Sequence, residues 1–311
     1  MSEAKATREG YGDALAELAA KNGQVVALDA DLNDSTRSDY IKKIDPSRFI
    51  GMGIAEQCMI GAAAGLSVSG KIPFASTFAI FSERAFEFTR NIISRNRLNV
   101  KIAGSHAGIF TGEDGKSAQA IEDIAIYRAL PYMMVLQPSD YIETKKMMHA
   151  LLDYNGPSYM RLLRNPLPNI HDEHYDFKLG NADVLREGTD VVIFSTGSMV
   201  HESLKAAETL SEKGVQLCVV NIHTIKPLDE KEIISLAKKC NMIFTAEDHN
   251  IIGGLGSAVA EVLSEQYPCR LTRIGMQDCY GESGKPAELY EKYGLSANHI
   301  VKTISQTLGK Q

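Results

Sequence analysis

The sequence has 311 residues, of which 44% are hydrophobic and 23% are charged. This composition is typical of a folded globular protein of about two domains. Its formal net charge of −6 argues against a nucleic acid or an anionic membrane surface as the main partner. No apolar run is long enough to cross a bilayer, and the start, Met1-Ser-Glu-Ala-Lys, lacks the pattern of a signal peptide. We therefore expect a cytoplasmic protein.

Strands and helices are predicted to alternate through the first half of the chain. Such alternation predicts a parallel sheet with helices on both faces, so residues 1–166 are predicted to form one doubly wound α/β domain. The expected helices are 7–21, 55–68, 82–95, 121–130 and 141–154; the expected strands are 24–29, 72–77, 100–104, 133–136 and 158–162; residues 31–38 are expected to form a loop.

The second half repeats this pattern after a break in composition. Residues 165–180 are rich in Pro, Asn, His and Asp and have little periodicity, so a linker is predicted at 167–181. Residues 182–311 are predicted to form a second doubly wound α/β domain, also with a mainly parallel sheet. Its expected strands are 190–195, 215–221, 242–246 and 269–274, and its expected helices are 199–213, 230–239 and 254–266.

The five cysteines carry no metal-site pattern. None belongs to a CxxC pair or has a histidine at ligand spacing, so we expect reduced thiols and no structural zinc or other metal ligand set in this chain. Cys58 lies in an apolar segment and is expected in the core.

Glu56 is the only charged residue between Arg48 and Lys71, in the glycine-rich segment 51–65. A helix that is apolar all round must pack on every side, so a carboxyl near its start needs a specific partner. Burial raises the proton affinity of a carboxyl, which suits a group that shares a proton with a heterocyclic base. The alternative is a glutamate that caps free N–H groups in the first turn of a helix. The local sequence supports both interpretations equally.

Three other stretches are candidates for chemistry. Residues 253–256 open a helix after a strand, but their spacing differs from the dinucleotide fingerprint and favours tight helix–strand packing. Gly112-Glu-Asp-Gly115 forms a turn with two carboxylates near His106, either solvated or functional. Asp31 and Ser35 follow a strand at its carboxyl end, where α/β sheets bind ligands.

Taken in order, several short motifs resemble the pyrimidine-binding domain of transketolase. The resemblance continues through the second half, so it covers nearly the whole chain, and the common order of the motifs carries it. The motifs are Ala6-Thr-Arg8, Ala30-Asp-Leu-Asn-Asp-Ser35, Gly53-Ile-Ala-Glu56-Gln, Ser76-Thr-Phe78-Ala-Ile-Phe81, His106, Gly112-Glu-Asp-Gly115 and Arg164.

The resemblance implies a site for thiamine diphosphate. It makes Glu56 the catalytic carboxyl that hydrogen-bonds the aminopyrimidine ring nitrogen and so favours the imino form that removes the thiazolium proton. Phe78 and Phe81 match aromatic positions around the pyrimidine. On local grounds a phenylalanine pair at this spacing is more often plain core. Asp31 and Leu32 correspond to loop residues that border the same pocket.

The resemblance also implies a substrate site. Arg8, Ser35, His106 and Arg164 match the positions that bind the phosphate end of a sugar phosphate, and guanidinium groups suit that ligand. His106 is expected to act in catalysis as well. Asp114 matches the carboxylate that recognises a substrate hydroxyl. On local grounds the arginines could form surface salt bridges and Asp114 could lie in a solvated turn.

Two positions depart from the family pattern. Many transketolases have Gly-Pro-Thr-His-Gln where this chain has Gly115-Lys-Ser-Ala118-Gln, so a histidine that contacts the donor is replaced by Ala118. The loss of that hydrogen-bond donor is expected to alter which ketose is accepted. Arg84 stands at the third aromatic position of the pocket, where guanidinium stacking would replace part of the ring stacking.

The chain lacks the Gly-Asp-Gly segment, followed at a distance by Asn, that anchors the diphosphate through a divalent metal in such enzymes. A cofactor bound only by its pyrimidine would lose most of its charge-based affinity. We therefore predict a split enzyme, in which an N-terminal transketolase subunit supplies the diphosphate domain and the Mg²⁺ ligands within an α2β2 assembly. The predicted reaction transfers a two-carbon ketol unit from a ketose phosphate to an aldose or aldose phosphate.

Two kinds of alternative remain open. Within the same cofactor class, the chain could be the beta subunit of a 2-oxo acid dehydrogenase or part of a deoxyxylulose phosphate synthase-like enzyme, although the phosphate-binding positions favour sugar phosphates. It could also be a non-catalytic regulatory or scaffold subunit, against which the retention of Glu56 argues.

Overall fold

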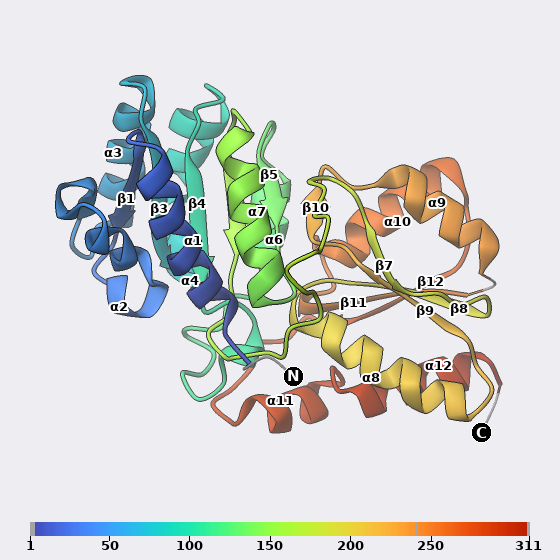
Figure 1. Ribbon diagram of the computed structural model, residues 1–311. Helices are drawn as coiled ribbons and strands as arrows, with labels where there is room; N and C mark the ends of the chain where they lie inside the picture. The colour runs from blue at the N-terminus through green and yellow to red at the C-terminus, as the bar shows by residue number, and fades with distance from the viewer. Residues whose placement is uncertain (1–3, 241, 310–311) are drawn as a thin grey trace.

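The computed structural model describes residues 4–240 and 242–309, which fold into two α/β lobes (Figure 1). Both sheets are mainly parallel, so the predicted fold class is confirmed. Met1 to Glu3 lie outside the described residues; they are part of the N-terminal segment that was predicted not to be a signal peptide. Within the described ranges, no helix is both long enough and apolar enough to span a membrane.

The first lobe is built on a sheet of seven described strands in the order β10-β5-β6-β4-β3-β1-β2. Its central strands are buried on both faces, which is why they read as continuous apolar runs. All neighbours pair in parallel except β10, which runs antiparallel to β5. The strands are β1 (Val25–Asp29), β2 (Phe49–Gly51), β3 (Ile72–Phe78), β4 (Lys101–Ser105), β5 (Met134–Leu136), β6 (Ser158–Arg161) and β10 (Thr224–Lys226).

Helices cover both faces of this sheet. On one face α1 (Thr7–Lys21) packs beside α7 (Tyr141–Asp153), and their apolar side chains share one core cluster with β1 and β6. On the other face α3 (Glu56–Val68) and α6 (Asp123–Arg128) contribute to a second cluster. This arrangement leaves the carboxyl ends of β1 and β3, with the loops that follow them, free to form a site.

The segment predicted as one amphipathic helix at 82–95 is broken into four pieces. It consists of α4 (Ala79–Ser82), a 3₁₀ turn (Glu83–Ala85), α5 (Phe86–Phe88) and a π-helical segment (Thr89–Ser94). Such changes of helical pitch often occur at functional sites, because they change the direction of neighbouring side chains. The predicted loop at 31–38 also contains structure, since α2 (Asn33–Thr36) forms a helical turn within it.

The second lobe has a sheet of five described strands in the order β12-β11-β8-β9-β7, with only β7 antiparallel. The sequence analysis missed β2, β7, β10, α11 and α12. Of these, α11 carries clear signals, because Pro286 stands at its start and Gly294 in a left-handed conformation at its end. The elements are β7 (Asp183–Arg186), β8 (Val191–Ser195), β9 (Leu217–Asn221), β11 (Met242–Asn250), β12 (Leu271–Met276), α8 (Ser198–Glu212), α9 (Glu230–Lys239), α10 (Leu255–Gln266), α11 (Pro286–Tyr293) and α12 (Ala297–Thr307).

Buried charges join the two lobes. Arg161 Nε lies 2.8 Å from Asp123 Oδ2, and Arg161 Nη2 donates to the Asp248 carbonyl at 2.9 Å. The Asp248 carboxylate accepts from the backbone N–H groups of Ile109 and Phe110. We call Asp123, Arg161 and Asp248 the interlobe charge network. Strand β10 also crosses from the second half of the chain into the first sheet, beside β5 (Figure 1). The predicted boundaries at 166 and 182 remain predictions.

Candidate active site

Glu56 is the first residue of α3 and is only 3% exposed, which agrees with the interpretation of a buried carboxyl. Its side chain nevertheless borders a cavity of about 190 Å³ at the carboxyl end of β1. We call this the Glu56 cavity. Its lining residues are Ala30, Asp31, Leu32, Ile54, Glu56, Phe81 and Arg84.

Arg84 is the charged partner of Glu56. Its Nε lies 3.4 Å from Glu56 Oε2, while 60% of the Arg84 side chain is exposed. A buried carboxylate is costly unless it is paired, so this contact explains how Glu56 is tolerated in an otherwise apolar segment. Both interpretations of the sequence describe part of the arrangement, because Glu56 lies in the first helical turn and also faces a cavity.

A stack of three rings leads from the Glu56 cavity to His106. The rings of Phe81 and Phe78 are nearly parallel with centroids 5.6 Å apart, and the rings of Phe78 and His106 lie 3.8 Å apart. Phe81 lines the cavity, whereas Phe78 is not among its lining residues and stands between Phe81 and His106. The stack fixes the plane of the imidazole relative to the cavity.

His106 is 2% exposed and its Nδ1 lies 2.9 Å from Ser105 Oγ. Burial, together with the positive charges of Arg8, Arg164 and Arg37, lowers the pKa of His106 to about 3. The ring is therefore neutral near pH 7, with one nitrogen that donates and one that accepts. Because a pKa near 3 makes the ring a poor base at pH 7, it is suited to position a substrate oxygen by hydrogen bonds.

Three arginines lie near His106, and we call Arg8, Arg37 and Arg164 the arginine cluster. Arg8 Nη1 donates to the Ser35 carbonyl at 2.8 Å. Arg164 Nη1 donates to Asp114 Oδ1 at 3.1 Å, so this predicted pair is in contact. The structure thus brings the predicted substrate residues together, and it places Arg37 near His106, which the sequence did not predict.

The loop that carries Asp31 and Ser35 is organised by a buried carboxylate. Asp29, the last residue of β1, accepts from the Leu32 N–H at 2.6 Å and from the hydroxyl groups of Thr36 and Ser38 at 2.6 and 2.8 Å. These bonds oppose the increase that burial causes in the pKa of Asp29. The loop is therefore held in one conformation beside the Glu56 cavity.

The loop that carries Asp114 and Ala118 is held by contacts with the second lobe. Gln119 Nε2 donates to the Gly112 carbonyl at 3.0 Å and to the Glu282 carbonyl at 2.9 Å. Gly115 is left-handed, with a φ of 76°, and a Cβ on it would lie 2.4 Å from Ser283 Oγ, so a larger residue would be strained and would displace that hydroxyl. The position of the loop therefore depends on residues 282–283 of the second lobe.

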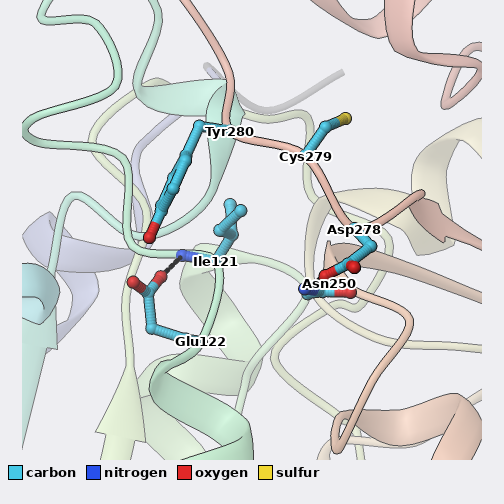
Figure 2. A pocket seen from close by; sticks show the side chains of 6 residues that line it. All are labelled: Ile121, Glu122, Asn250, Asp278, Cys279 and Tyr280. Atoms are coloured by element: carbon cyan, nitrogen blue, oxygen red, sulfur yellow. Dashed lines mark hydrogen bonds between the residues drawn. The ribbon is translucent and has the colours of Figure 1, made fainter.

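A second cavity, of about 150 Å³, lies between the lobes close to this loop (Figure 2). The Tyr280 hydroxyl points toward the Glu122 carboxylate in Figure 2, and Asn250 Nδ2 donates to Asp278 Oδ1 at 3.2 Å. No residue predicted for the active site lines it. In residues 4–240 and 242–309, no group of three or more His, Cys, Asp or Glu side chains is placed to bind a metal ion.

The outer face of α3 is exposed, contrary to prediction. Ile54 and Val68 are 73% and 75% exposed, Cys58 is exposed, and a Cβ on Gly61 or Gly65 would meet no atom within 4 Å. The predictions that this helix packs on every side and that Cys58 lies in the core are therefore wrong for the single chain. These five residues, which we call the α3 face, follow helical spacing and form one apolar stripe.

Comparisons with known proteins identify the family. Residues 3–169 match the family model of the transketolase pyrimidine-binding domain, and residues 180–300 match that of the transketolase C-terminal domain. The chain belongs to the transketolase family. The family resemblance seen in the sequence is thus confirmed.

Several relatives have the length of this chain. A protein named "Putative transketolase C-terminal section" from Methanocaldococcus jannaschii is 47% identical, covering 99% of this chain and 98% of the relative. The "6-deoxy-6-sulfo-D-fructose transketolase subunit SqwH" from Clostridium sp. (strain MSTE9) is 43% identical, with coverages of 96% and 93%. A structure described as "Split gene transketolase, inactive beta4 tetramer" is 45% identical, covers 99% of both chains and has a TM-score of 0.90.

Full-length transketolases are matched over only part of their length. Transketolase from Rattus norvegicus is 37% identical over 98% of this chain but 49% of its own length. The chain therefore corresponds to the two transketolase domains named above and spans about half of such a protein.

Proposed function

We propose that this chain is the C-terminal subunit of a split, thiamine diphosphate-dependent transketolase that moves a two-carbon ketol unit from a ketose phosphate to an aldose or aldose phosphate. The observation that carries the proposal is Glu56, a carboxyl that is buried and yet lines a cavity. A carboxyl in that position is suited to bind a ring nitrogen that must be protonated.

The Glu56 cavity fits one end of the cofactor. A cavity of about 150 Å³ holds a benzene ring, so about 190 Å³ suits a single pyrimidine. Glu56 would bind its ring nitrogen, and Phe81, backed by Phe78, would contact its face. The lining is unsuited to a diphosphate, because it contains two carboxylates, Asp31 and Glu56, and only one cation, Arg84.

The chain's own residues prepare this reaction. Bound thiamine diphosphate supplies the carbon nucleophile that breaks and forms the ketose carbon–carbon bond. Glu56 would share a proton with the pyrimidine nitrogen, and Arg84, which contacts Glu56 in this structure, would lie against the ring. His106, neutral and held by its stack, would donate a hydrogen bond to a substrate oxygen or accept one from a substrate hydroxyl. Ala118 offers no hydrogen bond, which alters donor choice.

The substrate residues bind the other end of the sugar. Arg8 and Arg164, with His106 and Ser35, bind its phosphate, and Asp114 accepts a hydrogen bond from a substrate hydroxyl. The support for this role is the concentration of positive charge near His106 on a chain of net charge −6.

A second subunit is the remaining part of the proposal. Ile54 belongs to the α3 face and also lines the Glu56 cavity, so a partner that covers this face would also close the cavity. We propose that this partner is an N-terminal transketolase subunit with the diphosphate domain and the Mg²⁺ ligands, in an α2β2 assembly. The similar split-gene chain, described as an inactive β4 tetramer, agrees with a need for another kind of subunit. We place the complex in the cytoplasm, with neither a nucleic acid nor a membrane as its partner.

Reconstitution tests this function. The chain alone is expected to show no thiamine-dependent turnover, and addition of the N-terminal subunit, thiamine diphosphate and Mg²⁺ is expected to restore it. Glu56→Gln keeps the size of the side chain but removes its acid–base capacity, so kcat should fall about 10²- to 10⁴-fold. The control is Glu87→Gln, at an exposed glutamate 63% accessible to solvent.

Three outcomes would contradict the proposal. Turnover by the chain alone would exclude the split arrangement. Normal turnover of the Glu56→Gln complex would favour the scaffold alternative. Activity on a 2-oxo acid with none on a ketose phosphate would favour the 2-oxo acid dehydrogenase alternative.

A further inference from the structure

Arg37 lies against α1, next to Arg8. Arg8 and Gly12 are one turn apart on the same face of α1. A Cβ on Gly12 would lie 2.5 Å from Arg37 Cβ and 2.8 Å from the Arg37 carbonyl oxygen. Only glycine fits at position 12, and its absent side chain brings Arg37 into contact with the helix that carries Arg8.

Arg8 and Arg37 bind adjacent carbonyl groups of one helical turn. Arg37 Nη1 donates to the Asp34 carbonyl, and Arg8 Nη1 donates to the Ser35 carbonyl. The Nε atoms of both arginines are buried and have no partner within the described part of the chain. The bonds to Asp34 and Ser35 use only Nη1 of each guanidinium, so further N–H groups remain for a ligand.

The backbone of Arg37 is in an unfavourable conformation. Its φ of 66° and ψ of 15° are left-handed, a conformation that glycine or asparagine adopts more easily. The residues on either side, Thr36 and Ser38, are both bonded to Asp29, which maintains this conformation. Strained residues that the surrounding structure holds in place are concentrated at ligand sites.

Two of the three arginines, Arg8 and Arg37, form no ion pair with a carboxylate within residues 4–240 and 242–309, whereas Arg164 Nη1 lies 4.0 Å from Glu113 Oε2. Arg164 is paired with Asp114, 34% of which is exposed. Burial and the charge of Arg37 lower the pKa of Arg8, which indicates mutual repulsion. An anion between these groups would relieve this repulsion, and more so if it carries two charges.

We infer that Arg37 is a specificity-determining residue that binds the terminal oxyanion of the sugar with Arg8 and Arg164, and that it favours a dianionic phosphate over a monoanionic sulfonate. This inference rests on the proposed function, and it adds a residue and a charge preference to it. The chemistry shared by both ligands is a tetrahedral oxyanion, and their charges distinguish them.

Small anions test the inference on the full chain without any catalysis. Binding of methyl phosphate and of methanesulfonate is measured by calorimetry at pH 8, where methyl phosphate is a dianion. Arg37→Asn keeps a residue that tolerates the left-handed backbone. It is expected to weaken methyl phosphate binding about tenfold or more and methanesulfonate binding less. Arg37→Lys, which keeps the charge, should lie between Arg37→Asn and the native chain.

The matched control is Arg97→Asn. Arg97 is also a left-handed arginine, with a φ of 54°, but it is exposed and lies over the Tyr132 ring. The Arg97→Asn change should leave the affinities for methyl phosphate and for methanesulfonate unchanged. Equal affinities of Arg37→Asn and the native chain for methyl phosphate would overturn the inference. An equal loss for both anions would overturn the charge preference.

The assembled complex separates this inference from the proposed function. Arg37→Asn should raise the KM for a phosphorylated aldose acceptor about tenfold and leave the KM for glycolaldehyde unchanged. Normal activity with no effect of Arg37→Asn refutes the inference alone. If Arg37→Asn weakens methyl phosphate binding but the native complex lacks transketolase activity, the proposed function fails and the anion site stands.

Discussion

The interlobe charge network and the arginine cluster place arginines in opposite environments. Arg161 and Asp123 are both fully buried and 2.8 Å apart, and Arg161 also donates to two backbone carbonyls. In the arginine cluster, Arg164 is 35% exposed, and the hydrogen bond of the Arg8 guanidinium within the described residues is to the Ser35 carbonyl. In the first region the arginine is paired with a buried carboxylate, and in the second region Arg8 and Arg37 form no ion pair with a carboxylate within the described residues.

This difference separates a structural role from a binding role. A buried ion pair is tolerated only when both partners are present, so loss of one partner destabilises the fold. A cluster of like charges that is open to solvent lowers stability slightly and binds an oppositely charged ligand. The contrast can be tested by changing one residue in each region.

The largest expected effect is on the network. Arg161→Met leaves the Asp123 carboxylate buried without its cation, so the free energy of unfolding should fall by about 3–5 kcal/mol. Denaturant unfolding of the full chain measures it. The double change with Asp123→Leu removes both charges and should recover part of the loss. A loss below about 1 kcal/mol for Arg161→Met would mean that the network is not structural.

The next effect concerns His171, which lies in the predicted linker and, like Arg161, is paired with carboxylates inside the chain. Its Nδ1 donates to Asp140 at 2.7 Å and its Nε2 to Asp183 at 2.9 Å. Burial lowers its pKa, but these hydrogen bonds outweigh burial and raise it to about 10. Because the folded pKa lies above the ordinary value near 6.5, its stabilisation is full below pH 6.5 and is lost as pH rises toward 10.

His171→Gln should therefore flatten the dependence of stability on pH between about 7 and 10. Unfolding curves at several pH values measure this, with His174→Gln, a nearby histidine outside these two ion pairs, as the control. An unchanged slope would show that His171 is not a charged link between the carboxylates.

A smaller effect on stability is expected in the arginine cluster. Arg164→Ala removes a partly exposed ion pair with Asp114, so the free energy of unfolding should change by less than about 1 kcal/mol. The KM for a phosphorylated acceptor should nevertheless rise about tenfold or more in the complex. A large loss of stability with an unchanged KM would place Arg164 with the structural arginines.

The last prediction is that the His106 ring does not change its protonation state near neutral pH. Because the pKa of His106 is about 3, its ring should stay neutral from pH 8 down to pH 5. Imidazole NMR shifts of His106, assigned with a His106→Asn variant, should stay constant over that range. The depressed pKa also means that His106 lowers stability as pH falls from about 6.5 toward 3. Titration near pH 6.5 would contradict this description.

The sequence was sufficient where the chemistry of single residues limits what they can do. A lone carboxyl in an apolar segment made burial of Glu56 one of two interpretations, the family resemblance favoured it, and the alternation of elements predicted two parallel sheets. Arg37 could not be found, because its place depends on the contact with Gly12 and on a loop organised by Asp29. Spacing along the chain does not reveal such contacts.

Other errors have different physical causes. The breaks between residues 79 and 94 leave the helical periodicity nearly intact, so the pattern predicted one helix. Strand β10 has three residues and pairs with a distant strand, which gives it little local signal. The α3 face was wrongly predicted to be buried. An apolar surface indicates that something covers it, but its composition does not say whether this chain or another one does.

Ile54 belongs both to the Glu56 cavity and to the α3 face. This shared position couples binding in the cavity to binding on the face. On the proposed arrangement, occupancy of the cavity and docking of the second polypeptide stabilise each other, and this coupling is reciprocal. Dilution of the complex should release vitamin cofactor and subunit together, and excess cofactor should slow that dissociation. A cell that makes more of one polypeptide than of the other would then accumulate inactive subunits, with no increase in the rate of the reaction.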